Sequence, residues 1–424
     1  MNLIEELRWR GMIQDIMPET EQYLLDNKTA GYIGFDPTSD SLHIGSLVPI
    51  FLLMHMQKAG HTPIALVGGA TGMVGDPSGK SEERNLLDEA TLQKNIDGVK
   101  AQLSRFLDFD SKENPAKLLN NFDWIGKMSF LEFIRDVGKH LTVNYMMAKD
   151  SVKKRIETGI SFTEFSYQLV QGYDFYHLWK NEGCALQCGG SDQWGNITSG
   201  TELIRRMDGG KAYAFTCPLI TKADGGKFGK TESGNVWLDA ERTSPYKFYQ
   251  FWINTSDEDA KRYIKIFTFR TQEEIKELET THAEAPHTRI LQNALAEDIT
   301  TLVHCEEALE TAKIASSILF GKTTFDALNQ LKERDMLEVF DGVPTFEVSK
   351  DSLENGINII DFLATDTQIL KSKGEARRAL KENSISINKQ KVQEDMVITK
   401  KDILKNNYVL IQRGRRNYFL VRII

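Results

Sequence analysis

The stretch Pro63-Ile64-Ala65-Leu66-Val67-Gly68-Gly69 is an unbroken apolar run that ends in two glycines. A short run without polar alternation is typical of a strand buried on both faces, as the strands of parallel sheets are. Two further short strands are expected at residues 32–35, before Asp36-Pro37, and at residues 185–188, before another pair of glycines. Long stretches with helical spacing separate these strands, so the sequence predicts an α/β fold with a mostly parallel sheet.

Two of the intervening stretches have distinct helical patterns. Residues 42–58 are apolar on nearly every side, which predicts a buried helix. Residues 162–176 place aromatic and aliphatic side chains at the spacing of one helix face. Ligands of parallel sheets bind outside the carboxyl ends of the strands. This is where the chain places its glycines and small polar residues.

Composition limits the class of protein. The chain has 424 residues, enough for two or three domains, and its 41% hydrophobic and 26% charged residues exclude a wholly disordered chain. The longest apolar run, residues 47–56, is about half of the ~20 residues that a bilayer crossing needs. The acidic start at Glu5-Glu6 argues against a signal peptide, and four cysteines make no disulfide framework. We therefore expect a soluble cytoplasmic protein without a membrane partner.

Charge is divided unevenly along the chain. Residues 357–424 carry 14 basic and 7 acidic side chains, a net of +7, whereas the whole chain has a net charge of −8. The first 356 residues therefore carry a net of −15. A basic tail on an acidic body suggests a polyanionic partner held by one end. A solvated basic surface with no partner is an equally good interpretation of composition alone.

Two phosphate-binding patterns are nearly matched and fail. Gly79-Lys80-Ser81 resembles the end of a P-loop, but Val74 stands where the first glycine is required. Residues 70–75 resemble the dinucleotide fingerprint, with Ala70 in place of its first glycine. These mismatches count against a P-loop kinase and a nicotinamide enzyme. They leave a glycine-rich loop whose backbone N–H groups can approach a phosphate.

The segment at residues 36–46 leaves a strand and enters the buried helix, with a hydroxyl and the His43 imidazole near the helix N-terminus. Orphan N–H groups and the helix dipole favour an anion there. Gly45 is small enough to let a flat base approach the backbone. The alternative is a capped helix with an incidental histidine.

Tyr167, Gln171 and Asp174 fall at i, i+4 and i+7 and so share one helix face. A phenol, an amide and a carboxylate suit a buried pocket for a small ligand that has both an ammonium and a hydroxyl. The alternative is a helix edge whose hydrogen bonds are internal.

The loop Gly225-Gly226-Lys227-Phe228-Gly229-Lys230-Thr231 has two lysines three apart. Mobile lysines can close over a polyphosphate and neutralise the charge that builds up during transfer. The alternative is an ordinary glycine turn with solvated lysines. The cysteines and histidines share no ligand spacing, so no protein-bound structural metal is predicted.

Taken together, these segments resemble the class I aminoacyl-tRNA synthetases. His43-Ile44-Gly45-Ser46 is similar to the HIGH motif of that class, and Lys227-Phe228-Gly229-Lys230-Thr231 to its KMSKS motif. Four longer segments are similar to bacterial-type tyrosyl-tRNA synthetases, and a fifth, 372–378, to an RNA-binding module of some ribosomal proteins. The four are Tyr32-Ile33-Gly34-Phe35-Asp36-Pro37-Thr38, Gly75-Asp76-Pro77-Ser78-Gly79-Lys80, Glu164-Phe165-Ser166-Tyr167 and Gly189-Gly190-Ser191-Asp192-Gln193-Trp194-Gly195-Asn196.

The resemblance implies an architecture and a set of partners. It implies a Rossmann-like parallel-sheet catalytic domain at 1–235, an α-helical anticodon-side domain at 236–325, a linker at 326–356 and a small α+β RNA-binding domain at 357–424. It also implies a homodimer with tRNA(Tyr) bound across both subunits. In the implied reaction the carboxylate of L-tyrosine attacks the α-phosphate of ATP, and the 3′-terminal ribose of the tRNA then takes the tyrosyl group. Mg²⁺ is expected with the ATP, carried mainly by its phosphates.

The resemblance also assigns residues to each ligand. Tyr32 and Asp174 would flank the substrate phenol, which can donate to a carboxylate while it accepts from a hydroxyl. The full set for tyrosine is Tyr32, Asp76, Tyr167, Gln171, Asp174 and Gln187. The set for ATP and the adenylate is Asp36, Gly45, Ser46, Gly190, Asp192, Gln193 and Lys230. The catalytic set is Thr38, His43, Lys80, Arg84, Lys227, Lys230 and Thr231. The residues expected to contact tRNA are Arg377, Arg378, Lys381, Arg413, Arg415 and Arg416.

The sequence departs from the motifs at two places. Ser46 occupies the second histidine position of HIGH, and a hydroxyl cannot carry imidazolium charge. Phe228, Gly229 and Thr231 change the second motif in a form that tyrosyl members commonly show, and both lysines remain. Two alternatives stay open: a tryptophanyl-tRNA synthetase, and a non-catalytic RNA-binding protein that keeps a synthetase-like core.

Overall fold

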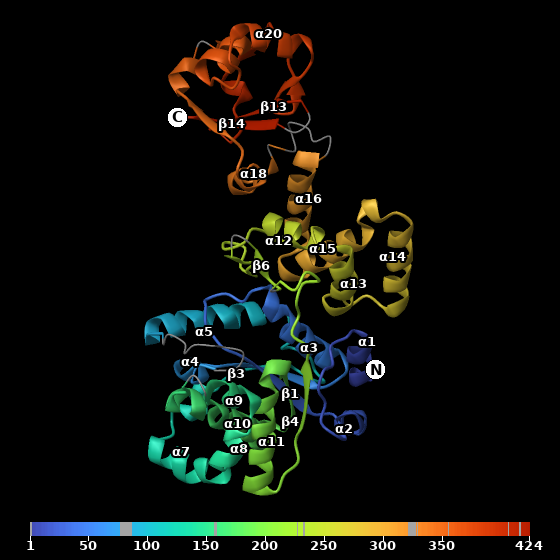
Figure 1. Ribbon diagram of the computed structural model, residues 1–424, viewed down its shortest axis with the longest axis vertical. Coiled ribbons are helices and arrows are strands. Elements are labelled where there is room, and N and C mark those ends of the chain that lie inside the picture. Colours follow the sequence, from blue (N-terminus) through green and yellow to red (C-terminus); the bar gives the residue numbers. More distant parts are fainter. Residues whose placement is uncertain are drawn as a thin grey trace. The chain divides into compact units, whose positions relative to one another are not determined.

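The computed structural model describes residues 2–76, 87–156, 159–226, 228–231, 234–320, 328, 330–354, 356–405, 407–414 and 417–424. The chain divides into two compact units, which Figure 1 shows in sequence colours. The first unit comprises Met1–Thr243 and Trp252–Val303, and the second comprises Ser244–Phe251 and His304–Ile424. Within the described residues, no helix is long and apolar enough to cross a membrane.

A five-stranded sheet with the order β3-β2-β1-β4-β5 forms the centre of the first unit. Every strand pair in it is parallel, so the predicted α/β fold is confirmed. The expected strand at 63–67 is buried along nearly its whole length. The strands are β1 (Ala30–Phe35), β2 (Thr62–Val67), β3 (Lys117–Asn120), β4 (Cys184–Gly190) and β5 (Tyr213–Cys217).

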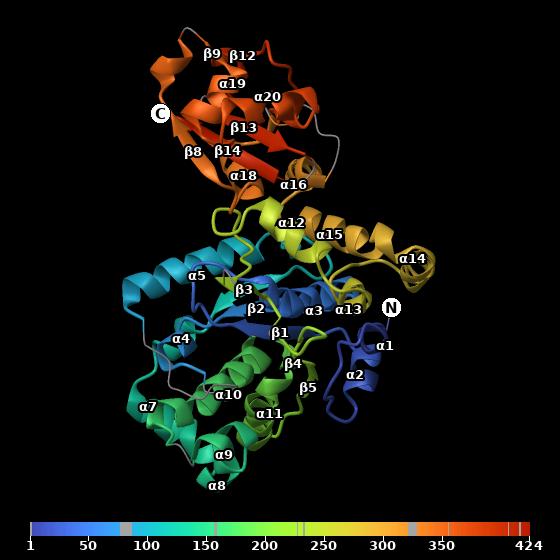
Figure 2. The same cartoon turned by 45° about the horizontal axis from the view of Figure 1, so that its top comes forward.

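Helices cover both faces of this sheet. Figure 2 shows α3 (Leu47–Lys58) and α5 (Glu89–Leu103) on one side, with α10 (Phe162–Glu182) and α11 (Trp194–Asp208) on the other. In the sheet, β2 lies on one side of β1 and β4 lies on the other. The strand order therefore reverses beside β1, and the carboxyl ends of β1 and β4 are where such a fold binds its ligands.

The buried helix predicted at 42–58 begins only at Leu47, after the 3₁₀ turn η1 (Ile44–Ser46). The start is later because residues 42–44 are held in extended pairing by a distant segment. Leu238 N donates to Leu42 O at 2.9 Å, and Ile44 N donates to Val236 O at 3.0 Å. The helix itself is buried as predicted, with Ile50 and Phe51 fully inaccessible to solvent.

The remaining elements of the first unit surround this core. Its helices include α1 (Leu3–Trp9), α2 (Thr20–Asp26), α4 (Thr71–Val74), α6 (Phe122–Ile125), α7 (Phe130–Asp136), α8 (Val143–Met147), α9 (Asp150–Ile156), α13 (Asp257–Ile266), α14 (Gln272–Glu284) and α15 (Ile290–Val303). A small two-stranded ladder pairs β6 (Lys230–Thr231) with β7 (Gly234–Asn235). The helix α12 (Pro245–Ile253) contributes residues to both units.

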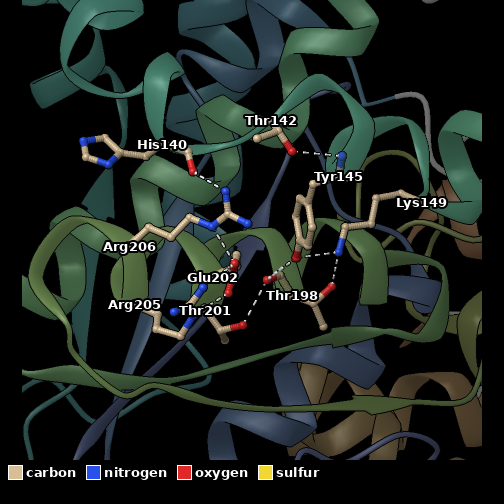
Figure 3. Close-up of polar contacts among 9 residues, drawn as sticks. All are labelled: His140, Thr142, Tyr145, Lys149, Thr198, Thr201, Glu202, Arg205 and Arg206. Atoms are coloured by element: carbon tan, nitrogen blue, oxygen red, sulfur yellow. Dashed lines mark hydrogen bonds and ion pairs between the residues drawn. The ribbon is translucent and has the colours of Figure 1, made fainter.

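A polar cluster fixes α8 on α11, as Figure 3 shows. Lys149 Nζ donates to Tyr145 Oη at 2.8 Å and to Thr198 Oγ1 at 2.9 Å, and Tyr145 Oη donates to Thr198 O at 3.1 Å. Burial lowers the pKa of Lys149 to about 8. On the next turn of α11, Arg206 pairs with Glu202 and also donates to the carbonyl of His140 at 3.0 Å. The α7–α8 region is thus tied to the core by directed contacts.

The second unit contains a mixed sheet with the order β11-β10-β13-β14-β8, covered by the short basic helix α20 (Lys373–Lys381). The predicted hairpin is present as β13 (Tyr408–Arg413) and β14 (Asn417–Ile423). The edge strand β8 (Thr345–Val348) runs parallel to β14, so part of the segment interpreted as a linker joins this sheet. The other elements are α16 (Glu306–Phe320), α18 (Glu333–Val339), β9 (Ile357–Asn358), α19 (Ile359–Asp361), β10 (Ile385–Ile387), β11 (Gln390–Lys391) and β12 (Val397–Ile398).

Candidate active site

A cavity of about 530 Å³ opens at the carboxyl ends of β1 and β4. Tyr32 of β1 and Gln187 of β4 both line the cavity, and they lie beside each other because the two strands are paired. The residues predicted for tyrosine and ATP that line this cavity are Tyr32, Asp36, Gly45, Asp76, Tyr167, Gln171, Asp174, Gln187, Gly190, Asp192 and Gln193. Residues far apart in the sequence of the first unit thus form one site.

The carboxyl of Asp174 lies buried in the cavity wall, with 1% of its surface exposed. Asn121 Nδ2 donates to one of its oxygens at 2.9 Å, and Trp124 Nε1 donates to the other at 2.8 Å. Burial raises the pKa of this carboxyl to about 7, against the lowering effect of the two donors, and the charge of Asp36 raises it further. Both oxygens are therefore held in fixed positions, although burial makes the ionised form of the carboxyl unfavourable.

The hydroxyl of Tyr32 is also buried and has no hydrogen-bond partner among the described residues. Burial, and then the negative charge of Asp174, raise the pKa of this phenol well above its usual value, so it stays protonated. The side-chain oxygens of Gln171 and Gln187 are buried and unpaired in the same way. A buried polar group without a partner costs free energy. Several such groups around one cavity point to a polar ligand that would pair with them.

Asp36 and Asp76 also line the cavity and give it a negative character. Tyr167 Oη donates to Asp36 Oδ2 at 3.3 Å, and Thr71 Oγ1 donates to Asp36 Oδ1 at 3.1 Å. Gln193 Nε2 donates to Asp76 Oδ2 at 2.7 Å, after the turn that follows β4. Such an arrangement favours a cationic group such as an ammonium.

Among the residues predicted to contact the nucleotide and its phosphates, Thr38, His43 and Ser46 do not line the cavity, whereas Gly45 does. His43 caps η1, because its Nδ1 accepts from Gly45 N at 3.0 Å. A side chain at position 45 would place its Cβ 2.7 Å from the His43 ring, so the ring would have to move. The His43 ring thus gives one structural reason for glycine here, and the approach of a base to Gly45 stays a prediction.

Other predicted residues lie elsewhere or outside the described part of the chain. Arg377, Arg378 and Lys381 are exposed on α20, and Arg413 forms an ion pair with Glu375 at 3.0 Å. Those outside the described residues are Lys80, Arg84, Lys227, Arg415 and Arg416, together with the side chains of Lys230 and Thr231.

Within the described residues, no group of three or more His, Cys, Asp and Glu side chains is placed to hold a metal ion. Cys188 and Cys217 line the cavity as free, buried thiols. Burial raises the pKa of Cys217 to about 12, which leaves it protonated and unreactive at neutral pH.

Sequence reasoning missed four functional neighbours of the cavity: Thr71, Asn121, Trp124 and Asn196. Asn121 and Trp124 follow β3, a strand that the sequence pattern did not reveal. Asn121 also accepts from Ala70 N at 2.7 Å and donates to Thr71 Oγ1 at 3.2 Å, so it joins the glycine-rich segment around residues 70–75 to Asp174. The sequence feature that could have indicated them is the pair Asn120-Asn121 at the end of a short apolar stretch.

Comparison with known proteins shows the family of this chain. The family model described as tRNA synthetases class I (W and Y) matches residues 25–321. The chain belongs to this family of class I tRNA synthetases. A second model, the Tyrosine--tRNA ligase SYY-like C-terminal domain, matches residues 335–421 of this class I synthetase.

Relatives of this class I synthetase match it over its full length. The Tyrosine--tRNA ligase of Flavobacterium johnsoniae is 62% identical over 100% of both chains. The Tyrosine--tRNA ligase of Porphyromonas gingivalis is 61% identical over 99% of both. Among solved structures, a C-terminally truncated mitochondrial tyrosyl-tRNA synthetase of Aspergillus nidulans has a TM-score of 0.68 and 31% identity. That match covers 75% of this chain and 94% of the other.

The raised pKa of Asp174 predicts a pH-dependent stability. The carboxyl has its ordinary pKa of 3.8 in the unfolded chain and about 7 in the folded protein. Between these values the folded state holds a proton that the unfolded state lacks, so stability falls as pH rises from about 4 to about 7. Each pKa unit is worth about 1.4 kcal/mol. Asp174→Asn keeps the volume and removes this contribution.

Urea unfolding of the wild type and of Asp174→Asn at about pH 5 and about pH 8 measures the effect. The wild type should lose stability relative to the variant at the higher pH. Parallel pH profiles for the two proteins would contradict the burial of an ionisable carboxyl at this position.

Proposed function

We propose that this class I synthetase is a tyrosine--tRNA ligase. It activates L-tyrosine with ATP to tyrosyl-adenylate and pyrophosphate and then transfers the tyrosine to the 3′ end of tRNA(Tyr) in protein synthesis. The observation that carries the proposal is the pair formed by the unpaired Tyr32 hydroxyl and the fixed Asp174 carboxyl in one buried wall. Its full-length relatives at 58–62% identity bear the same name.

The substrate phenol would complete this pair. It can donate its proton to Asp174 and accept from Tyr32, which gives the Tyr32 hydroxyl its missing partner and Asp174 a further donor. Phenylalanine would leave the Tyr32 hydroxyl unpaired and add no donor to Asp174, a discrimination for which tyrosyl-tRNA synthetases are themselves the standard example. The ammonium of the substrate would lie near Asp76, Tyr167 and Gln171, on the negative side of the cavity.

The chemistry of activation needs positioned charge rather than a covalent nucleophile. A carboxylate oxygen of tyrosine forms a bond to the α-phosphorus of ATP, and the bond from that phosphorus to the pyrophosphate oxygen breaks. Thr38 and His43 would contact the transferring phosphate. Asp36, Gly45, Ser46, Gly190, Asp192 and Gln193 would hold the nucleotide. The groups proposed to hold the leaving pyrophosphate are Lys80, Arg84, Lys227, Lys230 and Thr231, with Mg²⁺ bound to the ATP phosphates.

The basic segment 357–424 would bind tRNA. Arg377, Arg378 and Lys381 present their charges to solvent on one short helix, as phosphate contacts require. We propose a catalytic domain at 1–235, a helical domain at 236–325, a linker at 326–356 and an RNA-binding domain at 357–424, whose sheet also includes β8 from the linker segment. Translation takes place in the cytoplasm, which is the proposed location of this ligase.

A homodimer is the proposed assembly, and an exposed apolar surface supports it. The apolar surface consists of Phe130, Leu131, Ile134 and Phe162, whose exposed fractions are 64%, 76%, 45% and 66%. Three of these residues line a common cavity of about 320 Å³. Contiguous exposed apolar side chains of this size are typical of an interface between protein chains.

Tyrosine-dependent ATP–pyrophosphate exchange tests the proposed function directly. We expect exchange with tyrosine and none with phenylalanine or tryptophan, because only tyrosine pairs both Asp174 and Tyr32. Asp174→Ala should lose exchange by about 100-fold or more. Exchange with tryptophan alone would identify a tryptophanyl enzyme. A folded wild type that exchanges with no amino acid would favour the non-catalytic RNA-binding alternative.

Transfer to tRNA(Tyr), measured on the same preparation, separates the two steps. Arg377→Glu combined with Arg378→Glu should reduce transfer strongly, since each reversed charge repels phosphate. Exchange should stay at the wild-type level. Equal loss of both steps from a folded variant would contradict the proposed division of labour.

Dimer formation is tested by a charge placed on the apolar surface. Phe130→Asp should weaken the dimer by about tenfold or more, because the carboxylate would have to be desolvated at the interface. Light scattering should report twice the chain mass of 48.2 kDa for the wild type and a shift toward the monomer for the variant. Leu25→Asp, at a residue with 55% exposure on α2, is the matched control and should remain dimeric. An unchanged dimer in Phe130→Asp would place the interface elsewhere.

A further inference from the structure

Phe228, the first of the two residues between Lys227 and Lys230, is inserted into an aromatic box. The Phe228 ring stacks on Phe267 with centroids 5.4 Å apart and planes at 9°. It also meets Tyr263 at 5.1 Å and Trp252 at 5.9 Å. Trp252, Tyr263 and Phe267, which we call the aromatic box, are each at most 1% exposed. Phe228 also lines the active-site cavity, so this one residue connects the aromatic box with the cavity.

The aromatic box is part of a rigid core rather than of the loop. Tyr263 lies on α13, and Phe267 directly follows that helix. On its far side, Phe267 meets Phe51 of α3 edge-on at 5.9 Å. The helix α3 follows Gly45, which lines the cavity. The ring of Phe228 is therefore held by elements that also carry the nucleotide end of the site.

Backbone contacts tie the loop down on both sides of Phe228. Before it, Ala223 N donates to Asp259 Oδ1 at 3.0 Å, and Tyr263 Oη donates to Thr221 O at 3.3 Å. After it, Gly229 O accepts from Val236 N at 3.1 Å. Asp259 is 6% exposed, so this anchor is itself buried.

Gly229 permits the close approach that follows the anchor. Its φ is +82°, a region that L side chains rarely adopt. A Cβ at this position would lie 2.9 Å from Ile44 Cγ1. The chain thus turns from the aromatic box directly onto the start of η1, just before Lys230.

We propose that Phe228 is a positioning residue for adenylate formation: its insertion into the aromatic box fixes the backbone position from which the Lys230 side chain leaves. The proposal rests on the proposed function, in which Lys230 helps to hold the pyrophosphate. Because peptide units are planar, fixing residues 228 and 229 restricts the backbone position of residue 230. A backbone that is already fixed loses less conformational entropy when the ammonium group meets the phosphates.

Phe228→Ala tests the proposal in single-turnover adenylate formation. The rate constant should fall by about 10- to 100-fold, since a displacement of about 1 Å can cost that much in a positioned reaction. Tyrosine affinity, measured without ATP by equilibrium dialysis, should remain at the wild-type value. Phe228→Met refills the aromatic box and should recover the rate to within about threefold. Phe269→Ala, a half-buried ring that stacks on Phe51, is the control and should leave the rate unchanged.

A double variant separates positioning from general packing. In the Lys230→Ala background Phe228→Ala should add at most about twofold, because the group that it places is already absent. Fully multiplicative losses, a parallel loss of tyrosine affinity, or a wild-type rate in Phe228→Ala would each overturn the proposal. If that variant fails to fold, Gly229→Ala displaces the same segment and should show the same rate loss with intact tyrosine binding. An inactive wild type would refute the proposed function instead.

Discussion

The candidate site depends on two groups that line the same cavity, the fixed carboxyl of Asp174 and the unpaired hydroxyl of Tyr32. Asn121 and Trp124 use their donors to hold both carboxyl oxygens in place. The Tyr32 hydroxyl, by contrast, is buried without a partner among the described residues. Such a cost in folding stability is expected where a ligand later supplies the missing partner.

The sheet makes this arrangement possible at low conformational cost. Tyr32 and Gln187 lie beside each other because β1 and β4 are parallel neighbours, and Asp174 comes from the helix that packs beneath them. The cavity lies at the carboxyl ends of these strands. Tyr32, Gln187 and Asp174 therefore stand on regular elements, which hold a site more precisely than loops do.

Much of the site could be predicted because its signals are local. Tyr167, Gln171 and Asp174 share a helix face by spacing alone, and the structure places all three in one cavity. The strand at 63–67 was predictable from its apolar run. By contrast, β3 is half-exposed along its length and carries little pattern, so Asn121 and Trp124 behind it were missed.

The remaining differences come from contacts between distant parts of the sequence. The late start of α3 results from pairing with residues 236–238, which no local pattern around His43 encodes. The same holds for Phe228, whose box is built from residues 252–267. A motif comparison marks Phe228 only as a variation between two lysines. The packing of Phe228 in the aromatic box gives a physical reason for an aromatic residue at this position, and that packing becomes visible only in the tertiary structure.

A crystal structure with L-tyrosine bound and no nucleotide tests the central claim most directly. The account predicts the phenol oxygen within hydrogen-bond distance of both Asp174 and Tyr32, with the Asn121 and Trp124 contacts to Asp174 retained. A substrate ring bound elsewhere in the cavity, with the Tyr32 hydroxyl still unpaired, would contradict it.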